Sequence, residues 1–269
     1  MQPLLDADVL AYEIGFAAEV GWKSMKEGEV VDPPPFEYVA ELLDNRIAEI
    51  CGKVMATEPP ILYLTGKSNF RDKIAKKIPY KGNRDTQKRP FHYKNLRAYM
   101  QVKYRCVVTD GIEADDAMCI EQVSVPRWGE TIICTRDKDL RQCPGWHFGW
   151  ELGNQPQFGP ELVEGFGYIK LSSDNKKLTG VGDKFFYAQV LMGDQVDSVP
   201  GLPNIGPKKA YELLVNTNTK EEAEKAVVEA YKGAYGDNWR EEMLEQAQLV
   251  WMVRELDEEG NPVMWEFIE

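Results

Sequence analysis

Residues 4–12 read LLDADVLAY, an apolar run that meets two closely spaced acids before a helical pattern begins. This stretch predicts a short buried strand ending at Asp6 or Asp8, followed by helices through about residue 26 and over residues 36–55. Three more apolar runs of strand length follow, ILYLT at 61–65, RCVVT at 105–109 and ETIICT at 130–135. Helical patterns at 91–102 and 113–123 separate them. Strands that alternate with helices indicate an α/β fold with a mainly parallel central sheet flanked by helices.

The last third of the chain has a different character. Residues 145–180 are rich in glycine, aromatic and turn residues, which predicts a hairpin or an irregular connection. Helical patterns then follow one another at 183–192, 208–215, 220–235 and 239–256. We therefore expect an α/β core over residues 1–180 and a helical module over residues 181–269.

The length of 269 residues and an apolar content of 43% suit one α/β domain with a smaller appended module. The start, MQPLLDADVL, lacks the features of a signal peptide, and no segment approaches eighteen uncharged apolar residues. We expect a cytoplasmic protein. With only His92 and His147 present, a histidine-based zinc site or a Ser/His/Asp triad is disfavoured.

Charge is unevenly distributed along the chain. The net charge of −12 alone argues against a nucleic-acid partner. Between Lys67 and Arg105, however, thirteen basic residues face only two acids, Asp72 and Asp85. One basic segment is thus set into an acidic body, and a solvated basic helix or loop is the alternative interpretation.

Acids gather where the predicted strands end. Asp6 and Asp8 close the first strand, and Asp137 and Asp139 follow the fourth. Three more, Glu113, Asp115 and Asp116, open the helix after the third strand. Each alone is explained by the preference of acids for the first turn of a helix. Because parallel strands bring their carboxyl ends together, the whole set favours a divalent metal site, and oxygen ligands suit Mg²⁺ or Mn²⁺.

Two further acids, Asp194 and Asp197, precede a predicted helix–turn–helix with the sequence GLPNIGPKKA at 201–210. This pattern is typical of a helix-hairpin-helix, in which glycines let backbone N–H groups approach a phosphate. A plain Gly/Pro turn between packed helices is the alternative.

Five motifs stand in order along the chain: DADVLAY at 6–12, PYKGNRD at 79–85, GIEADDA at 111–117, CTRDKDL at 134–140 and GDQVDSVPGLPNIGPKKA at 193–210. In this order the chain resembles the 5′-nucleases: flap endonucleases, the 5′-nuclease domains of bacterial DNA polymerases, and above all the stand-alone 5′-to-3′ exonucleases of bacteriophages. The resemblance covers residues 4–214. It implies the PIN-like nuclease core with a helical arch, here the basic segment at about 67–94, and a helix-hairpin-helix at about 194–215.

The resemblance also implies roles for single residues. The metal-binding acids would be Asp6, Glu113, Asp115, Asp116, Asp137, Asp139, Asp194 and Asp197. Lys81 and Arg84 would be catalytic basic residues at the base of the arch. DNA would contact Lys67, Arg71, Tyr80, Lys81, Arg84, Gly201, Asn204, Gly206, Lys208 and Lys209. One position departs from the family, which usually has an aspartate after the second strand where this chain has Thr65 and Gly66; Asp8 is the candidate to compensate.

By this resemblance the chain would be a two-metal hydrolase of phosphodiester bonds near the 5′ ends of DNA, acting as an exonuclease or flap endonuclease in replication or nucleotide salvage. Two Mg²⁺ ions, replaceable by Mn²⁺, would be the cofactors, with K⁺ at the hairpin turn. Asp6, Glu113 and Asp115 would serve the first ion, and Asp137, Asp139, Asp194 and Asp197 would serve the second ion or its water shell. RNA–DNA hybrids are a further candidate substrate, and we expect a monomer. Two alternatives are a non-catalytic helix-hairpin-helix DNA-binding protein and a PIN-like ribonuclease, which would lack the hairpin.

Overall fold

The structure is a computed structural model that describes residues 1–25, 32–84 and 88–268. The described chain divides into two compact units. The first comprises residues 1–67, 87–137 and 146–161, and the second comprises 68–86, 138–145 and 162–269. The sequence placed a boundary near residue 180, whereas the observed chain passes several times between the units.

A six-stranded sheet organises the first unit. Its strand order is β3-β2-β1-β4-β5-β6. The strands are β1 (Gln2–Asp6), β2 (Ile61–Asn69), β3 (Arg105–Gly111), β4 (Thr131–Cys134), β5 (Gly145–Gly149) and β6 (Phe158–Val163). β1 runs parallel to β2 and β4, with Leu4 opposite both Ile61 and Ile133. Every residue of β1 is buried, as expected for a parallel strand covered on both faces.

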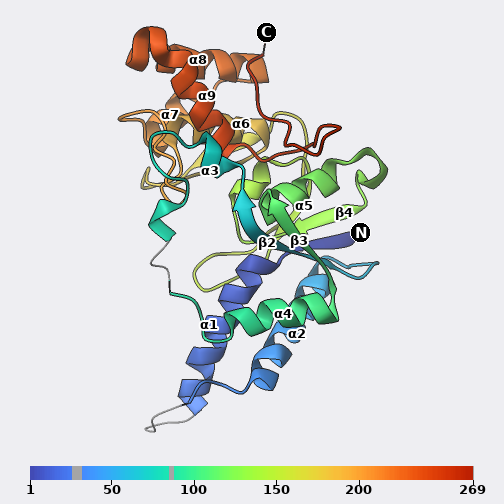
Figure 1. The fold of residues 1–269 in the computed structure, drawn as a ribbon. Helices are drawn as coiled ribbons and strands as arrows, with labels where there is room; N and C mark the ends of the chain where they lie inside the picture. The colour runs from blue at the N-terminus through green and yellow to red at the C-terminus, as the bar shows by residue number, and fades with distance from the viewer. Residues whose placement is uncertain (26–31, 85–87, 269) are drawn as a thin grey trace. The chain divides into compact units, whose positions relative to one another are not determined.

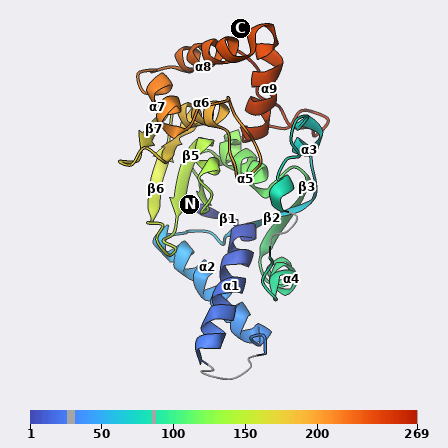
Figure 2. The ribbon, with the colours of Figure 1, turned by 90° about the vertical axis from the view of Figure 1, so that its left-hand side faces the viewer.

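Helices cover both faces of this sheet. α1 (Ala7–Met25), α2 (Phe36–Lys53) and α4 (Tyr93–Lys103) contact one another and lie on one side of the sheet, while α5 (Ala114–Val123) lies on the other (Figures 1 and 2). The core joins Leu5, Leu62 and Ile132 of three strands to the apolar faces of α1 and α2. A parallel sheet needs such cover because its strands are apolar on both faces.

The second unit is mainly helical. α6 (Gly182–Met192) contacts α7 (Pro207–Leu214), α8 (Lys220–Tyr235), α9 (Trp239–Val250) and a hairpin of β7 (Tyr168–Leu171) and β8 (Leu178–Val181). Every residue of α6 from Gly182 to Leu191 is buried, as expected of a central helix. Its rings, including Phe185 and Phe186, pack with Val227, Met243 and their neighbours.

Two predicted elements differ from the structure. The last helix ends at Val250 rather than near residue 256, because Trp251 adopts an extended conformation. The basic segment is no continuous helix in its described part: β2 extends to Asn69, and only the four-residue α3 (Arg71–Ile74) and the 3₁₀ turn Gly82–Arg84 precede α4. None of the helices in residues 1–25, 32–84 and 88–268 is long and apolar enough to cross a membrane.

Candidate active site

Asp6 is a buried acid of the first unit with a raised pKa. It ends β1, and only 3% of its surface is exposed. One carboxylate oxygen accepts a hydrogen bond from the Val9 amide at 3.0 Å and the other from the Thr135 hydroxyl at 2.7 Å. Burial raises the pKa of Asp6 to about 7, with repulsion from Asp8 and Asp137 adding to the effect. A cation beside this carboxylate would favour its charged form.

Thr135 connects Asp6 to Asp137. Its hydroxyl donates to Asp6 and accepts a hydrogen bond of 2.9 Å from the Asp137 backbone amide. Because β1 and β4 are adjacent and parallel, their carboxyl ends deliver these two acids to the same sheet edge. Thr135 is not among the predicted site residues, although it lies two residues before Asp137 in the quoted motif.

Two of the three acids at the start of α5 cap the helix itself. Glu113 and Asp116 form a capping box, in which each side chain accepts a hydrogen bond from the other residue's backbone amide. Both are buried, and Asp116 is fully enclosed. Asp115 between them is half-buried. Of the three predicted ligands, Asp115 is therefore the one that takes no part in the capping box.

Gly66 stands where the family usually has an aspartate, and the structure explains why. A Cβ atom on Gly66 would lie 1.9 Å from the Thr109 carbonyl oxygen of β3. Any side chain would therefore force β2 and β3 apart. Its neighbour Thr65 is also engaged, because the Thr65 hydroxyl accepts a hydrogen bond of 3.0 Å from the Ala114 amide at the start of α5.

Asp8, the candidate to compensate for Gly66, has a structural role. Its carboxylate pairs with the Arg97 guanidinium and accepts a hydrogen bond of 2.7 Å from the Thr65 amide. Arg97 in turn donates to the Thr65 carbonyl at 2.6 Å. Asp8 thus ties α1 to β2 and α4, and Arg97, which we predicted only as part of the basic run, neutralises it.

In the second unit, two predicted metal acids hold a lysine. The Lys138 ammonium nitrogen lies 2.7 Å from a carboxylate oxygen of Asp139 and 2.8 Å from one of Asp194. Burial alone would raise the pKa of Asp194, but the charge of Lys138 and the hydrogen bonds from Lys138 and the Val196 amide together outweigh burial and lower that pKa. Lys138 is not among the predicted site residues, although its position between Asp137 and Asp139 is a visible signal.

The predicted catalytic lysine of the second unit also faces an acid. Lys81 Nζ lies 3.8 Å from a carboxylate oxygen of Asp197, which also accepts a hydrogen bond of 3.1 Å from the Tyr80 hydroxyl. The Lys81 amide donates to the Asp197 carbonyl at 2.9 Å, and its φ of 53° is unusual for a non-glycine residue. This contact fixes the lysine beside a predicted metal ligand. The side chain of Arg84 lies outside the described part of the structure.

Two pairs of acids are linked by a shared neighbour: Asp6 and Asp137 through Thr135, and Asp139 and Asp194 through Lys138. Among residues 1–25, 32–84 and 88–268, no three or more His, Cys, Asp or Glu side chains form a group able to hold a metal ion. Mg²⁺ binds through one or two carboxylates and keeps several waters, so a carboxylate pair with oxygen neighbours suits it. The Asp139–Asp194 pair already holds one cation, the Lys138 ammonium, which shows that the pair is shaped for positive charge.

Two residues that we predicted to contact DNA, Arg71 and Tyr80, are buried in the structure. Arg71 is fully buried, and its guanidinium donates to the carbonyls of Leu249 and Trp251, at 3.1 and 2.6 Å. It therefore caps the carboxyl end of α9, where a cation is favoured. Tyr80 is 8% exposed, and its ring is too enclosed to stack on an unpaired base. Lys67, by contrast, is exposed.

The helix-hairpin-helix loop lies between α6 and α7. Gly201 has a φ of 66°, and a Cβ there would lie 2.3 Å from the Gly193 nitrogen, so glycine is required. The Gly201 amide donates to the buried side chain of Gln246 at 2.9 Å and is not directed at a ligand. Gly206 caps α7, with Lys208 and Lys209 exposed in the first turn behind it.

Those two lysines have weak internal contacts. Lys209 donates to the carbonyl of Asn204, whose φ of 63° turns the chain, at 3.0 Å. Lys208 lies 3.8 Å from Glu212 one helical turn away, and both side chains are exposed. Exposed pairs of this kind are worth little, so both ammonium groups remain accessible to an anionic partner.

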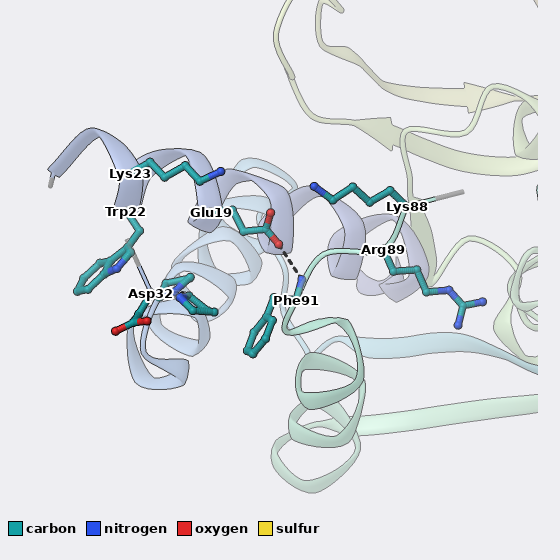
Figure 3. Close-up of a pocket in the computed structure, with 9 residues that line it drawn as sticks. Glu19, Trp22, Lys23, Asp32, Lys88, Arg89 and Phe91 are labelled. Atoms are coloured by element: carbon teal, nitrogen blue, oxygen red, sulfur yellow. Dashed lines mark hydrogen bonds between the residues drawn. The ribbon is translucent and has the colours of Figure 1, made fainter. Parts of the chain in front are cut away.

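A cavity of about 320 Å³ opens elsewhere in the first unit. Figure 3 shows Lys23 and Lys88 extending toward one another across Glu19, whose carboxylate accepts a hydrogen bond of 2.7 Å from the Phe91 amide. The Phe91 ring is 65% exposed. None of the predicted site residues lines this cavity.

Comparisons with known proteins bear on the family. No family model matches the chain. DNA polymerase I of Rhizobium leguminosarum is 34% identical over 113 residues, which cover 40% of this chain and 10% of the polymerase. Flap endonuclease Xni of Shewanella halifaxensis is 31% identical over 121 residues, 44% of each protein. The match thus spans less than half the length of these curated relatives.

A solved structure bears on the fold. A bacteriophage T5 flap endonuclease in complex with DNA and metal ions matches with a TM-score of 0.52 and 15% sequence identity, covering 93% of this chain and 98% of that chain. At this identity the likeness concerns the fold, and it confirms the predicted parallel sheet flanked by helices. The resemblance drawn from the five motifs is likewise confirmed: the chain is a relative of the flap endonucleases in sequence and shares the fold of a phage flap endonuclease.

Proposed function

We propose that the chain is a metal-dependent 5′-nuclease that hydrolyses phosphodiester bonds near the 5′ ends of DNA, as an exonuclease or flap endonuclease. The observation that carries this proposal is the placement of Asp6 and Asp137 at the ends of two adjacent parallel strands, joined through Thr135. The named relatives include flap endonucleases and DNA polymerase I, which agrees with this reaction class.

Divalent metal is the proposed cofactor, with Mg²⁺ as the physiological ion and Mn²⁺ as a substitute. Bound divalent ions would supply a hydroxide nucleophile and stabilise the leaving oxygen. In the first unit the proposed ligands are Asp6, Glu113, Asp115 and Asp137. In the second unit they are Asp139, Asp194 and Asp197. Asp116 serves chiefly to hold the start of α5 through the capping box.

The protein's own cations have two proposed tasks. Lys81, fixed by Asp197, would stabilise negative charge on the scissile phosphate as it develops. Arg84 would assist it. Lys208 and Lys209, exposed at the start of α7, would contact duplex phosphates without reading base sequence. The carbonyl-rich turn before α7 is the proposed place for K⁺, and we propose a cytoplasmic monomer.

The test is cleavage of a 5′-labelled flap, a blunt duplex and an RNA–DNA hybrid, each with Mg²⁺, with Mn²⁺ and with chelator. Asp115→Ala and Asp137→Ala should lower the rate by several orders of magnitude and leave DNA binding measurable, because the acids position the metal and the lysines provide affinity. Glu58→Ala, at an exposed acid of the same unit, is the matched control.

Three results distinguish the proposals. Cleavage by the parent protein that disappears with chelator supports the nuclease, and the three substrates reveal its preference. Metal-dependent cleavage that survives in both aspartate variants would contradict the assigned ligands. DNA binding without cleavage on any substrate would favour a non-catalytic helix-hairpin-helix protein.

A further inference from the structure

Lys138 holds two acids of the second unit at once. Its ammonium nitrogen lies 2.7 Å from Asp139 Oδ1 and 2.8 Å from Asp194 Oδ2. Asp139 and Lys138 are neighbours at the start of the 3₁₀ turn Asp139–Gln142, whereas Asp194 comes from the loop after α6. A single side chain therefore bridges two segments that are 56 residues apart.

Both carboxylates are fixed by donors other than Lys138. Asp194 Oδ1 accepts hydrogen bonds from the amides of Val196 and Asp197, at 2.8 and 3.4 Å. Asp139 Oδ1 accepts one from the Gln189 side chain at 2.5 Å. Gln189 lies on the buried helix α6 and is itself held by Gln142. The two carboxylates are thus set in place by the fold around them.

Lys138 differs from its partners in its freedom to move. Its side chain is 41% exposed, against 13% for Asp139 and 8% for Asp194. A lysine ends in a compact ammonium on a flexible four-carbon stem, so it can leave a contact without a change in the backbone. The ammonium can therefore withdraw toward solvent while the carboxylates stay in place.

The Lys138 ammonium group is held between two negatively charged carboxylates. Its nitrogen lies within hydrogen-bonding distance of a carboxylate oxygen of Asp139 and of one of Asp194. Lys138 thus occupies the position of a cation between two carboxylates. A divalent ion that uses the same oxygens competes with the ammonium group, because two cations held at the same oxygens repel each other.

We propose that Lys138 is a built-in counter-cation for Asp139 and Asp194, and that divalent metal binds this pair only by displacing its ammonium group. The inference rests on the proposed metal-dependent function. It assigns Lys138 a positioning role: the lysine keeps the two carboxylates together without metal and sets the metal concentration at which the second unit is loaded.

The test is the binding of Mn²⁺ to the whole protein without DNA. Binding is measured by titration calorimetry and by electron paramagnetic resonance of free Mn²⁺. Lys138→Met removes the charge and keeps a stem of similar length. It should bind Mn²⁺ about tenfold more tightly at one site, the change expected from two partly exposed ion pairs. Lys138→Arg keeps the charge and should not show this gain.

Lys103→Met is the matched control. Lys103 is 45% exposed and pairs with Asp44 in the first unit, so its loss changes the net charge equally. It should leave Mn²⁺ affinity unchanged. The double variant Lys138→Met with Asp194→Asn should lose the tenfold gain, which locates the gained affinity at this pair.

Thermal unfolding provides a second readout. Without metal, Lys138→Met should melt below the parent because Asp139 and Asp194 then repel each other, and saturating Mn²⁺ should raise its melting temperature more than that of the parent. Unchanged or weaker Mn²⁺ affinity in Lys138→Met would overturn the proposal. Failure of the proposed nuclease function would show differently, as absence of metal-dependent cleavage by the parent protein.

Discussion

Introducing the family's aspartate at Gly66 should destabilise the first unit and leave metal binding unimproved. A Cβ at this position would lie 1.9 Å from the Thr109 carbonyl oxygen, whereas real Cβ atoms almost never come within 3.0 Å of another heavy atom. β2 and β3 would have to separate by about 1 Å, which strains the packing and lengthens hydrogen bonds between them. Overpacking of this kind costs about 1–3 kcal/mol, and each weakened hydrogen bond about 1 kcal/mol more.

We therefore expect Gly66→Asp and Gly66→Ala to lose at least about 3 kcal/mol of unfolding free energy. Urea unfolding should show this as a midpoint lowered by about 1 M or more, at an m value of about 2–3 kcal/mol per M. Gly52→Ala is the control: nothing lies within 4 Å of a Cβ there, and alanine near the end of α2 should be neutral or slightly stabilising. A Gly66→Ala midpoint within about 0.2 M of the parent would refute the steric argument.

Three further changes have definite expected outcomes. Arg71→Met should lower the unfolding free energy by about 3 kcal/mol in thermal unfolding, because the carbonyls of Leu249 and Trp251 lose their hydrogen-bond donor. The same change should leave the salt dependence of DNA binding unaltered. Lys208→Ala with Lys209→Ala should reduce the slope of log affinity against log salt by up to about two, equally for unrelated duplexes. Lys81→Ala should slow single-turnover cleavage at saturating protein about a hundredfold, and a normal rate would remove Lys81 from the catalytic residues.

The sheet and the first acids were predictable because both depend on local sequence. Short apolar runs mark β1, β2 and β4, and the acids that follow β1 and β4 are close neighbours of those runs. Once the strands are parallel and adjacent, Asp6 and Asp137 must come to the same sheet edge. The end of α9 was less predictable, since the helical pattern continues past Val250 while the chain does not.

Residue roles that depend on distant partners could not be predicted. Lys138 and Asp194 meet across 56 residues, and nothing near Lys138 in the sequence specifies that contact. Gly66 is explained only by the closeness of the Thr109 carbonyl, which belongs to the spacing of two strands. In both cases the deciding quantity is a tertiary distance, and the sequence alone contains the residue type but not the distance.

In the basic segment, residues 67–105, the number of basic residues overstates how many can contact DNA. Its thirteen basic residues suggested one nucleic-acid surface. Several of them, however, already form ion pairs with acids or donate hydrogen bonds to carbonyls within the protein. Arg71 caps α9, Arg97 binds Asp8, Lys103 binds Asp44, and Lys77 pairs with Glu242. A cation engaged in such a contact is less available to a DNA phosphate, so it displaces few of the counterions that are condensed on DNA. The salt dependence of DNA binding should therefore report far fewer phosphate contacts than the number of basic residues, with Lys67 and other exposed lysines supplying them.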